Sequence, residues 1–261
     1  MEMNTQTPEM AHVRPERREA WLGNATVRYE VAGEGEPLVL VHGLSGSTRW
    51  WARNIPALAA HYRVHPVDLP GFGGLRRLRK DFALVRAADW MQRWMDAVGL
   101  ERAHLIGHSM GGLVGIRFAA RYPQRVRRLV LAAPASLPTG ASLAGQLLPL
   151  ATALRYATPS FLPVLAYDAL RAGPATLLRA ARDILHADVR ADLRAIAAPT
   201  LLLWGERDAL VPPSIGPLLR GEIPDARLLL IPGAGHVLMW DRPRAFDDAV
   251  LAFLAGEPVG E

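Results

Sequence analysis

The hydrophobic pattern alternates along most of the chain between short apolar runs and longer amphipathic segments. Residues 38–41 form a continuous apolar run, which is typical of a strand buried on both faces of a parallel sheet. Strands that alternate with amphipathic helices predict a mostly parallel sheet with helices on both faces. The expected strands are 25–31, 38–41, 62–67, a run directly before residue 107, 127–132, 199–204 and 227–231; the expected helices are 50–60, 82–98, 113–121 and 243–255.

One long segment interrupts this alternation. Residues 134–198 are rich in Leu, Ala and Pro and contain no clear strand, whereas helical patterns occur at 173–186 and 189–196. We expect a helical lid here, inserted into a core formed by residues 19–133 and 199–261. The alternative is a long connection whose helices simply pack on that core.

Two other segments bear on where the protein works. Residues 1–18 are polar and charged and lack the apolar stretch of a secretory signal, so we expect a flexible tail and a cytoplasmic location. The uncharged run 129–154 is interrupted by Pro134, Pro138 and Pro149. We therefore expect no stable membrane insertion.

Composition excludes several kinds of chemistry. The 261 residues include no cysteine, which excludes disulfides, thiolate catalysis and cysteine-bound metals. The net charge is +5, and arginines cluster at 76–79 and 125–128, but no nucleic-acid motif accompanies them, so we interpret them as solvated faces and expect no nucleic-acid partner. No His, Asp and Glu cluster has metal-ligand spacing, and no glycine pattern suits a dinucleotide. The sequence thus predicts neither a metal nor a cofactor.

The strongest chemical signal is Gly-His-Ser-Met-Gly at residues 107–111. This G-x-S-x-G pattern lies between an expected strand and an expected helix, as a nucleophile elbow requires. Ser109 is therefore the candidate nucleophile. The N–H groups at the start of the following helix point to where an oxyanion would form.

Four motifs together carry a resemblance to a known family: the elbow, the His42-Gly43 turn, the loop 68–73 (Asp-Leu-Pro-Gly-Phe-Gly) and the late Gly-Ala-Gly-His at 233–236. They resemble the α/β-hydrolase fold superfamily over residues 20–255, and most of all the branch that includes bacterial carboxylesterases and lipases. The resemblance implies an α/β fold with a helical lid and serine chemistry. It does not imply a substrate, because one scaffold carries many reactions.

The resemblance also implies a base and an acid for Ser109. In the chain order Ser, Asp, His the base comes late, and His236 lies in a glycine-containing loop after the last strand. Asp208 follows the 199–204 strand, where this fold usually places the carboxylate. The other acids that remain candidates are Glu206, Asp225 and Asp241.

Oxyanion donors are expected from the main chain. By position they are the N–H groups of Met110, directly after the nucleophile, and of Leu44, after the His42-Gly43 turn. Asp68 looks like a second acid, but its turn sequence favours hydrogen bonds to backbone N–H groups.

These features predict a serine hydrolase that cleaves small-molecule carboxylic esters with short to medium acyl chains, through an acyl-enzyme. A C–C bond hydrolase, a lactonase or amidase, a cofactor-free perhydrolase and a non-turnover ligand receptor are alternatives, and the oligomeric state is left open. Relatives that cleave C–C bonds often have a Gly-Pro-Gly-rich oxyanion loop, whereas residues 43–47 lack proline. The lid side chains expected to line the acyl pocket are Leu147, Leu148, Leu150, Phe161, Leu162 and Leu165.

Overall fold

The computed structural model describes residues 15–23, 25–78, 83–136 and 144–259. Its centre is a six-stranded parallel sheet with the order β4-β3-β5-β6-β7-β8. The residues of β5 and β7 are all buried, which explains the apolar run 201–204 in β7, whereas β5 also buries His104 and His108. The strands are β3 (Pro37–Val41), β4 (Arg63–Val67), β5 (Ala103–His108), β6 (Val126–Ala132), β7 (Thr200–Gly205) and β8 (Ala226–Ile231).

A two-stranded antiparallel hairpin precedes this sheet. It consists of β1 (Glu16–Leu22) and β2 (Ala25–Val31), and Ala32 bridges it to Val64 of β4. Only β2 was expected. The expected flexible tail overlaps β1, because the strand begins at Glu16.

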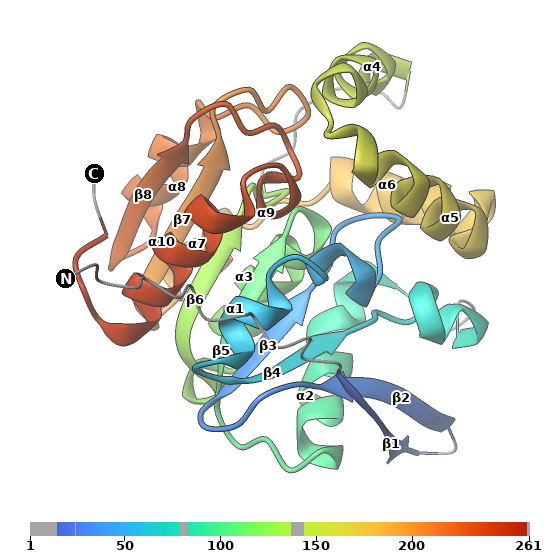
Figure 1. Cartoon of the computed structure of the whole chain (residues 1–261), viewed down its shortest axis with the longest axis vertical. Helices are drawn as coiled ribbons and strands as arrows, with labels where there is room; N and C mark the ends of the chain where they lie inside the picture. Colours follow the sequence, from blue (N-terminus) through green and yellow to red (C-terminus); the bar gives the residue numbers. More distant parts are fainter. Residues whose placement is uncertain (1–14, 24, 79–82, 137–143, 260–261) are drawn as a thin grey trace, which may run out of the picture.

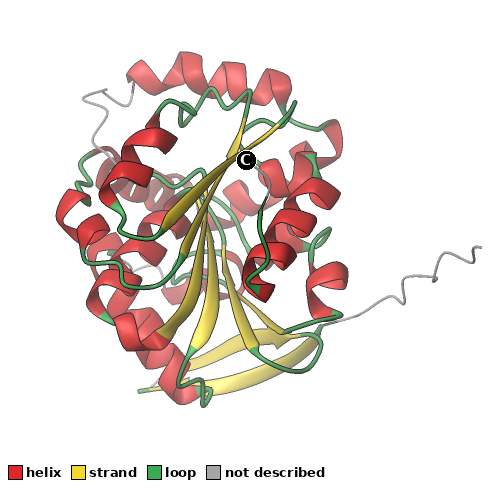
Figure 2. Cartoon of the chain, turned by 90° about the vertical axis from the view of Figure 1, so that its left-hand side faces the viewer, coloured by secondary structure: helices red, strands yellow, loops and turns green. Residues whose placement is uncertain are grey.

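Helices cover both faces of the sheet, as Figure 2 shows. Three expected helices differ in the structure. The segment 50–60 is split into a 3₁₀ turn η1 and a short α1, and the segment 82–98 becomes η3 and α2, with Phe82 outside the described residues. The helix expected at 113–121 already begins at Met110. Pro56 lies in the first turn of α1, where a missing N–H costs nothing. The helices of the core are η1 (Thr48–Trp51), α1 (Ile55–Ala59), η2 (Gly73–Leu78), η3 (Leu84–Arg86), α2 (Ala87–Ala97), α3 (Met110–Arg121), η4 (Pro123–Arg125), α8 (Ile215–Glu222), α9 (Leu238–Asp241) and α10 (Pro243–Ala255).

The inserted segment between β6 and β7 is helical. Its part 144–185 lies beyond the carboxyl ends of the central strands, at the upper right of Figure 1, whereas residues 190–194 pack against the core helices α3 and α8. The expected α/β fold with a mostly parallel sheet, helices on both faces and a helical insertion is confirmed. The insertion comprises η5 (Ala144–Gln146), α4 (Leu147–Tyr156), η6 (Pro159–Phe161), α5 (Leu162–Ala172), α6 (Pro174–Leu185) and α7 (Arg190–Arg194). Among the described residues, no helix is both long and apolar enough to cross a membrane.

The candidate site lies at the C-terminal end of the parallel strands. Because β3, β5, β7 and β8 are parallel, the segments that follow them emerge at the same end of the sheet. These segments carry the oxyanion loop, Ser109, Asp208 and His236, in that order. Positions far apart in the sequence therefore meet at one end of the sheet.

Candidate active site

Ser109 occupies a strained backbone turn between β5 and α3. Its φ is 50° and its ψ is −112°, a region that non-glycine residues rarely adopt. The neighbouring glycines are required by close packing: a Cβ on Gly107 would lie 2.4 Å from the carbonyl oxygen of Gly111, and one on Gly111 would lie 2.3 Å from that of Val41. The turn thus projects the serine from the end of the strand, which is the geometry of a nucleophile elbow.

His236 and Asp208 form a buried hydrogen-bonded pair. His236 Nδ1 lies 2.8 Å from Asp208 Oδ2, and the other carboxylate oxygen accepts the backbone N–H groups of Leu210 and Val211, at 2.9 Å each. The Asp208 side chain has no exposed surface and that of His236 is 10% exposed. With Nδ1–H donating to Asp208, a neutral His236 presents Nε2 as a proton acceptor.

His108 holds the His236 loop against the elbow. Its Nε2 lies 2.9 Å from the carbonyl oxygen of His236, and the two imidazole rings lie 4.8 Å apart, centroid to centroid. Burial lowers the pKa of His108 well below its usual range, so the ring is neutral and donates from Nε2. Because His108 directly precedes Ser109, this contact brings the loop of His236 to the candidate nucleophile.

Two of the three other candidate acids bind backbone groups through their carboxylates, whereas Asp225 accepts the N–H of Thr200 with its main-chain carbonyl at 2.8 Å. Glu206 Oε2 accepts the N–H of Gly233 at 2.9 Å, and Asp241 Oδ2 accepts that of Gly235 at 3.0 Å. Asp241 also accepts the hydroxyl of the lid residue Thr158 at 2.6 Å. Both carboxylates shape the loop that carries His236, whereas Asp208 is the acid on its ring.

The oxyanion loop packs directly on the elbow. A Cβ on Gly43 would lie 2.7 Å from His108 Nδ1 and 3.2 Å from Ser109 Cβ, so only glycine allows this approach. Leu44 follows at once, and Gly46 N–H closes the turn on the carbonyl oxygen of Gly43 at 3.1 Å. As the first residue of α3, Met110 has an N–H with no acceptor inside the helix.

Two polar side chains, His42 and Asp68, hold the base of this loop. His42 Nδ1–H donates to the carbonyl oxygen of Gly43 at 2.8 Å, and its Nε2 accepts the N–H of Leu69 at 3.1 Å. Burial lowers the pKa of His42, which favours this neutral ring. Asp68 accepts the N–H groups of Thr48 at 2.8 Å and Gly74 at 2.6 Å, as its turn sequence indicates.

The predicted lid residues lie in different environments. Leu147, Leu148 and Leu150 on α4 are 66%, 77% and 44% exposed, and α4 contains no buried residue. Phe161 is buried instead, with its ring 5.0 Å from that of Trp50 and 5.3 Å from that of Trp240.

On α5, Leu162 is half-exposed and Leu165 packs on the core. The ring of Trp50 lies 5.7 Å from that of His108, so Phe161 is separated from the nucleophile's neighbour by one aromatic ring. Of the predicted lid residues, Phe161 is the one connected to His108 through ring contacts, with Trp50 between them.

Sequence reasoning missed Asp168 of α5. Its side chain is fully buried, and Oδ2 accepts the hydroxyl of Ser47 at 2.6 Å, at the end of the oxyanion loop. A single acid within the otherwise apolar run 161–170 is the signal that would have pointed to it.

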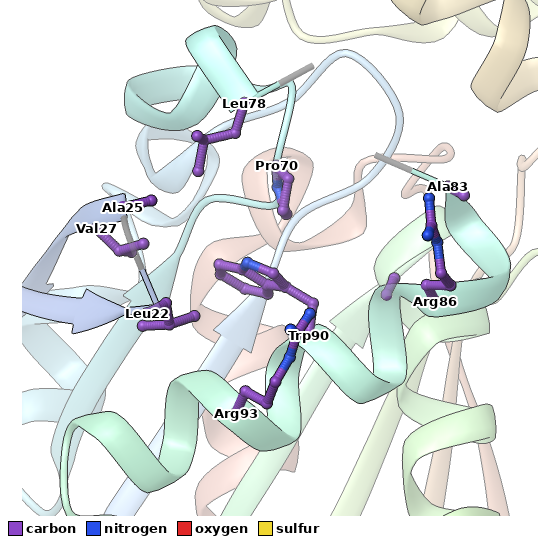
Figure 3. Close-up of a pocket in the computed structure, with 10 residues that line it drawn as sticks. Leu22, Ala25, Val27, Pro70, Leu78, Ala83, Arg86, Trp90 and Arg93 are labelled. Carbon is purple, nitrogen blue, oxygen red and sulfur yellow. The ribbon is translucent and has the colours of Figure 1, made fainter. Parts of the chain in front are cut away.

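One cavity of about 320 Å³ lies between the β1–β2 hairpin and α2. Figure 3 shows Trp90, Arg86 and Arg93 on one side and Leu22 and Val27 on the other. None of its described lining residues belongs to the Ser109, Asp208 and His236 set. In the described part of the chain, no three His, Asp or Glu side chains are grouped so that they could hold a metal ion.

Comparisons with known proteins agree with this architecture. A family model described as the alpha/beta hydrolase fold matches residues 36–171 and 166–243. The chain is 35% identical to the 2-hydroxy-6-oxo-6-phenylhexa-2,4-dienoate hydrolase of Burkholderia cepacia, over 91% of this chain and 94% of the relative. It is 30% identical to the pimeloyl-(acyl-carrier protein) methyl ester esterase of Aeromonas hydrophila, over 88% of this chain and 99% of that protein.

A solved structure, a membrane phospholipase A described as a bacterial virulence factor, superposes with a TM-score of 0.81 at 27% identity, covering 95% of this chain and 87% of that one. The matched family model and the shared topology extend over most of the sequence. The chain therefore belongs to the α/β-hydrolase fold family and is a hydrolase.

Proposed function

We propose that this hydrolase cleaves small-molecule carboxylic esters with short to medium acyl chains, through an acyl-enzyme on Ser109. The observation that carries the proposal is the buried Asp208–His236 pair, whose loop is held against the elbow by His108. Such a set supplies a serine nucleophile, a base in a fixed tautomer and a carboxylate that stabilises the imidazolium.

In the first half of the reaction, Ser109 Oγ attacks the ester carbonyl carbon while its proton passes to Nε2 of His236. The tetrahedral intermediate then expels the alcohol, which takes the proton from His236, and the acyl group stays on Ser109. In the second half a water molecule repeats the attack and releases the carboxylic acid. Asp208 keeps its charge throughout, since its role is to orient and stabilise the protonated ring.

The main-chain N–H groups of Leu44 and Met110 are our proposed donors to the oxyanion. Loss of one such donor costs roughly 10²–10³ in kcat in related chemistry. Because these groups belong to the backbone, their positions depend on the packing of Gly43 against Ser109 Cβ. A side chain at residue 43 would displace the loop and the donor together.

The lid is our proposed source of the acyl-pocket wall. Phe161 supports this role best, because it packs on Trp50, which lies against His108. Leu162 and Leu165 follow on the same short stretch of α5. The exposed leucines 147, 148 and 150 of α4 would contact an acyl chain only if it extended past this wall.

A second candidate function is C–C bond hydrolysis. It is favoured by the 35% identity to a 2-hydroxy-6-oxo-6-phenylhexa-2,4-dienoate hydrolase over 91% of the chain. Ester hydrolysis is favoured by the identity to a methyl ester esterase and by an oxyanion loop without proline. We place the ester first because this loop departs from the Gly-Pro-Gly pattern.

The test is a substrate panel with purified protein. It contains p-nitrophenyl and aliphatic esters of graded acyl length, lactones and a 2-hydroxy-6-oxo-dienoate, each run beside the Ser109→Ala variant. The proposal expects the highest kcat/KM for a short or medium ester and no turnover by the variant. A dienoate that exceeds every ester would establish the second candidate, and single-turnover hydrolysis alone would indicate a ligand receptor.

A further inference from the structure

We propose that a small, multiply charged anion binds in an arginine-lined cavity at the seam between the lid, the β1–β2 hairpin and the residues that follow the oxyanion loop. The cavity measures about 700 Å³, within the range of about 300–1,000 Å³ that small-molecule sites occupy. Its arginines come from four separate segments: Arg17 and Arg28 from the hairpin, Arg49 from η1, Arg76 from η2 and Arg171 from α5.

Positive charge dominates the lining. The described lining residues include five arginines but only two acids, Glu30 and Asp68. Asp68 is already bound by the backbone N–H groups of Thr48 and Gly74. Glu30 lies 3.9 Å from Arg17, a long contact that contributes little. Arg28 is paired with Glu19 at 2.8 Å, so an anion would meet a positive field that comes chiefly from Arg76 and Arg171.

Two of the guanidinium groups are held in place by one aromatic ring. The Tyr167 ring lies 4.8 Å from the guanidinium carbon of Arg49 and 5.2 Å from that of Arg171. Arg49 also donates to Asp168 at 3.0 Å. Stacking of this kind fixes the planar groups and leaves their edges available to an anion.

Arg76 and Arg171 still lack acidic partners. Within the described residues neither side chain forms an ion pair, and the buried Nε of Arg171 has no hydrogen-bond partner. A buried donor without an acceptor is costly, and an anionic oxygen would satisfy it. These two arginines are accordingly the residues on which the proposed site depends most.

The chemistry of the lining defines the ligand class. Guanidinium groups bind carboxylates and phosphates through paired N–H donors, and several of them favour a ligand with more than one anionic group. Because Arg171 belongs to the lid and Arg49 follows the oxyanion loop, a bound anion would bridge the two. This site is separate from the ester chemistry, and its test requires no turnover.

The experiment is isothermal titration calorimetry of the full chain with pyrophosphate and, separately, with citrate, at an ionic strength held constant with sodium chloride. We expect saturable binding of at least one probe, weakened about tenfold or more in Arg76→Ala and in Arg171→Ala. The control is Arg244→Ala, an exposed position on α10, which should bind as the wild type does. The stronger probe tells whether phosphate or carboxylate groups are preferred.

Two results would overturn the site: no saturable heat with either probe up to about 10 mM, or equal affinities in wild type and both arginine variants. Circular dichroism of each variant establishes that the fold is retained. If Arg171→Ala does not fold, Arg171→Lys keeps the charge but removes the paired donors, and should still weaken binding. Arg76→Ala and Arg171→Lys then decide the outcome together.

Discussion

Asp168, on lid helix α5, accepts a hydrogen bond from the hydroxyl of Ser47 at 2.6 Å, across a sequence separation of 121 residues. Ser47 in turn caps η1 by accepting the N–H of Arg49 at 3.3 Å. Burial raises the pKa of Asp168, because the charged carboxylate is withdrawn from water. The lid and the end of the oxyanion loop are thus joined by a buried polar contact.

Removal of that carboxylate should affect both stability and turnover. Asp168→Ala leaves the Ser47 hydroxyl without its acceptor, so we expect a loss of about 1–3 kcal/mol in the free energy of unfolding and a lower kcat. Asp168→Asn retains an acceptor oxygen and should lie between wild type and alanine. The measurements are urea unfolding and kcat and KM for the best ester. The control is Asp188→Ala, an exposed lid acid, and equal effects of the two alanine variants would show that the contact has no special role.

The nucleophile can be tested directly. Ser109→Ala should fold normally, since alanine meets the same positive φ as serine, but kcat should fall roughly 10⁴–10⁶-fold. A fluorophosphonate probe should label Ser109 in the wild type and leave the variant unlabelled. Mass spectrometry of the labelled protein identifies the site, and an active, labelled variant would disprove the assignment.

The acid is tested by two variants that differ in their hydrogen bonds. Asp208→Asn removes the charge beside His236 Nδ1 and should reduce kcat about 10⁴-fold, as loss of the tautomer-fixing carboxylate does elsewhere. Glu206→Gln retains an oxygen for the N–H of Gly233 and should lose little activity. Steady-state kinetics on one ester distinguish them. A reversed order of the two losses would make Glu206 the acid.

The lid wall makes a prediction about acyl length. Each buried methylene is worth about 0.8 kcal/mol, so kcat/KM should increase with chain length until the wall is reached. Phe161→Ala enlarges the space beside Trp50 and should move the optimum to a longer ester. Leu148→Ala, at a side chain that is 77% exposed, is the matched control and should leave the optimum where it is. If only the Leu148 variant moved it, α4 rather than η6 would form the wall.

Asp247 of α10 should make stability depend on pH. Burial raises the pKa of this carboxyl to about 7, although Asn54 Nδ2 donates to it at 2.8 Å. Its unfolded pKa is about 3.9, so the folded state binds the proton more tightly. The contribution to stability is therefore full below about pH 4 and is lost as the pH rises through 7, with a slope of at most about 1.4 kcal/mol per pH unit.

Asp247→Asn removes this titration. The free energy of unfolding of the variant minus that of the wild type should be larger at pH 8 than at pH 5, as measured by urea unfolding at both values. Asp248→Asn changes the exposed neighbour and serves as the control. Parallel curves for wild type and Asp247→Asn would contradict the prediction.

The parts of the fold that sequence reasoning captured are those with a local cause. The strands β3 and β7 are continuous apolar runs because both faces of the sheet are covered, and α10 has its predicted bounds. The strand β1 was missed because only Ala20 in it is buried, so it has no apolar alternation to detect. β1 is a strand because its backbone pairs with β2, which its composition does not indicate.

In the site, too, the features with a local sequence pattern were predicted and those that depend on distant contacts were not. Ser109 carries a local pattern, whereas the contact of His108 with the carbonyl oxygen of His236 spans 128 residues. The side chain of Asp168 meets Ser47 only because α5 folds back onto the core. Such contacts depend on the whole topology, and no spacing along the chain predicts them.

Among the described residues, positive φ in non-glycine residues occurs at Ser45, Ser109 and Ala133. All three follow strands that are neighbours in the sheet, β3, β5 and β6, at the C-terminal ends where the reaction is expected. Unfavourable backbone of this kind costs about 1–3 kcal/mol per residue, and the surrounding fold must compensate for it. Selection for thermostability and selection for turnover would therefore act in opposite directions at these positions. Glycine substitutions there would relieve the backbone strain and stabilise the fold, but would lower catalysis.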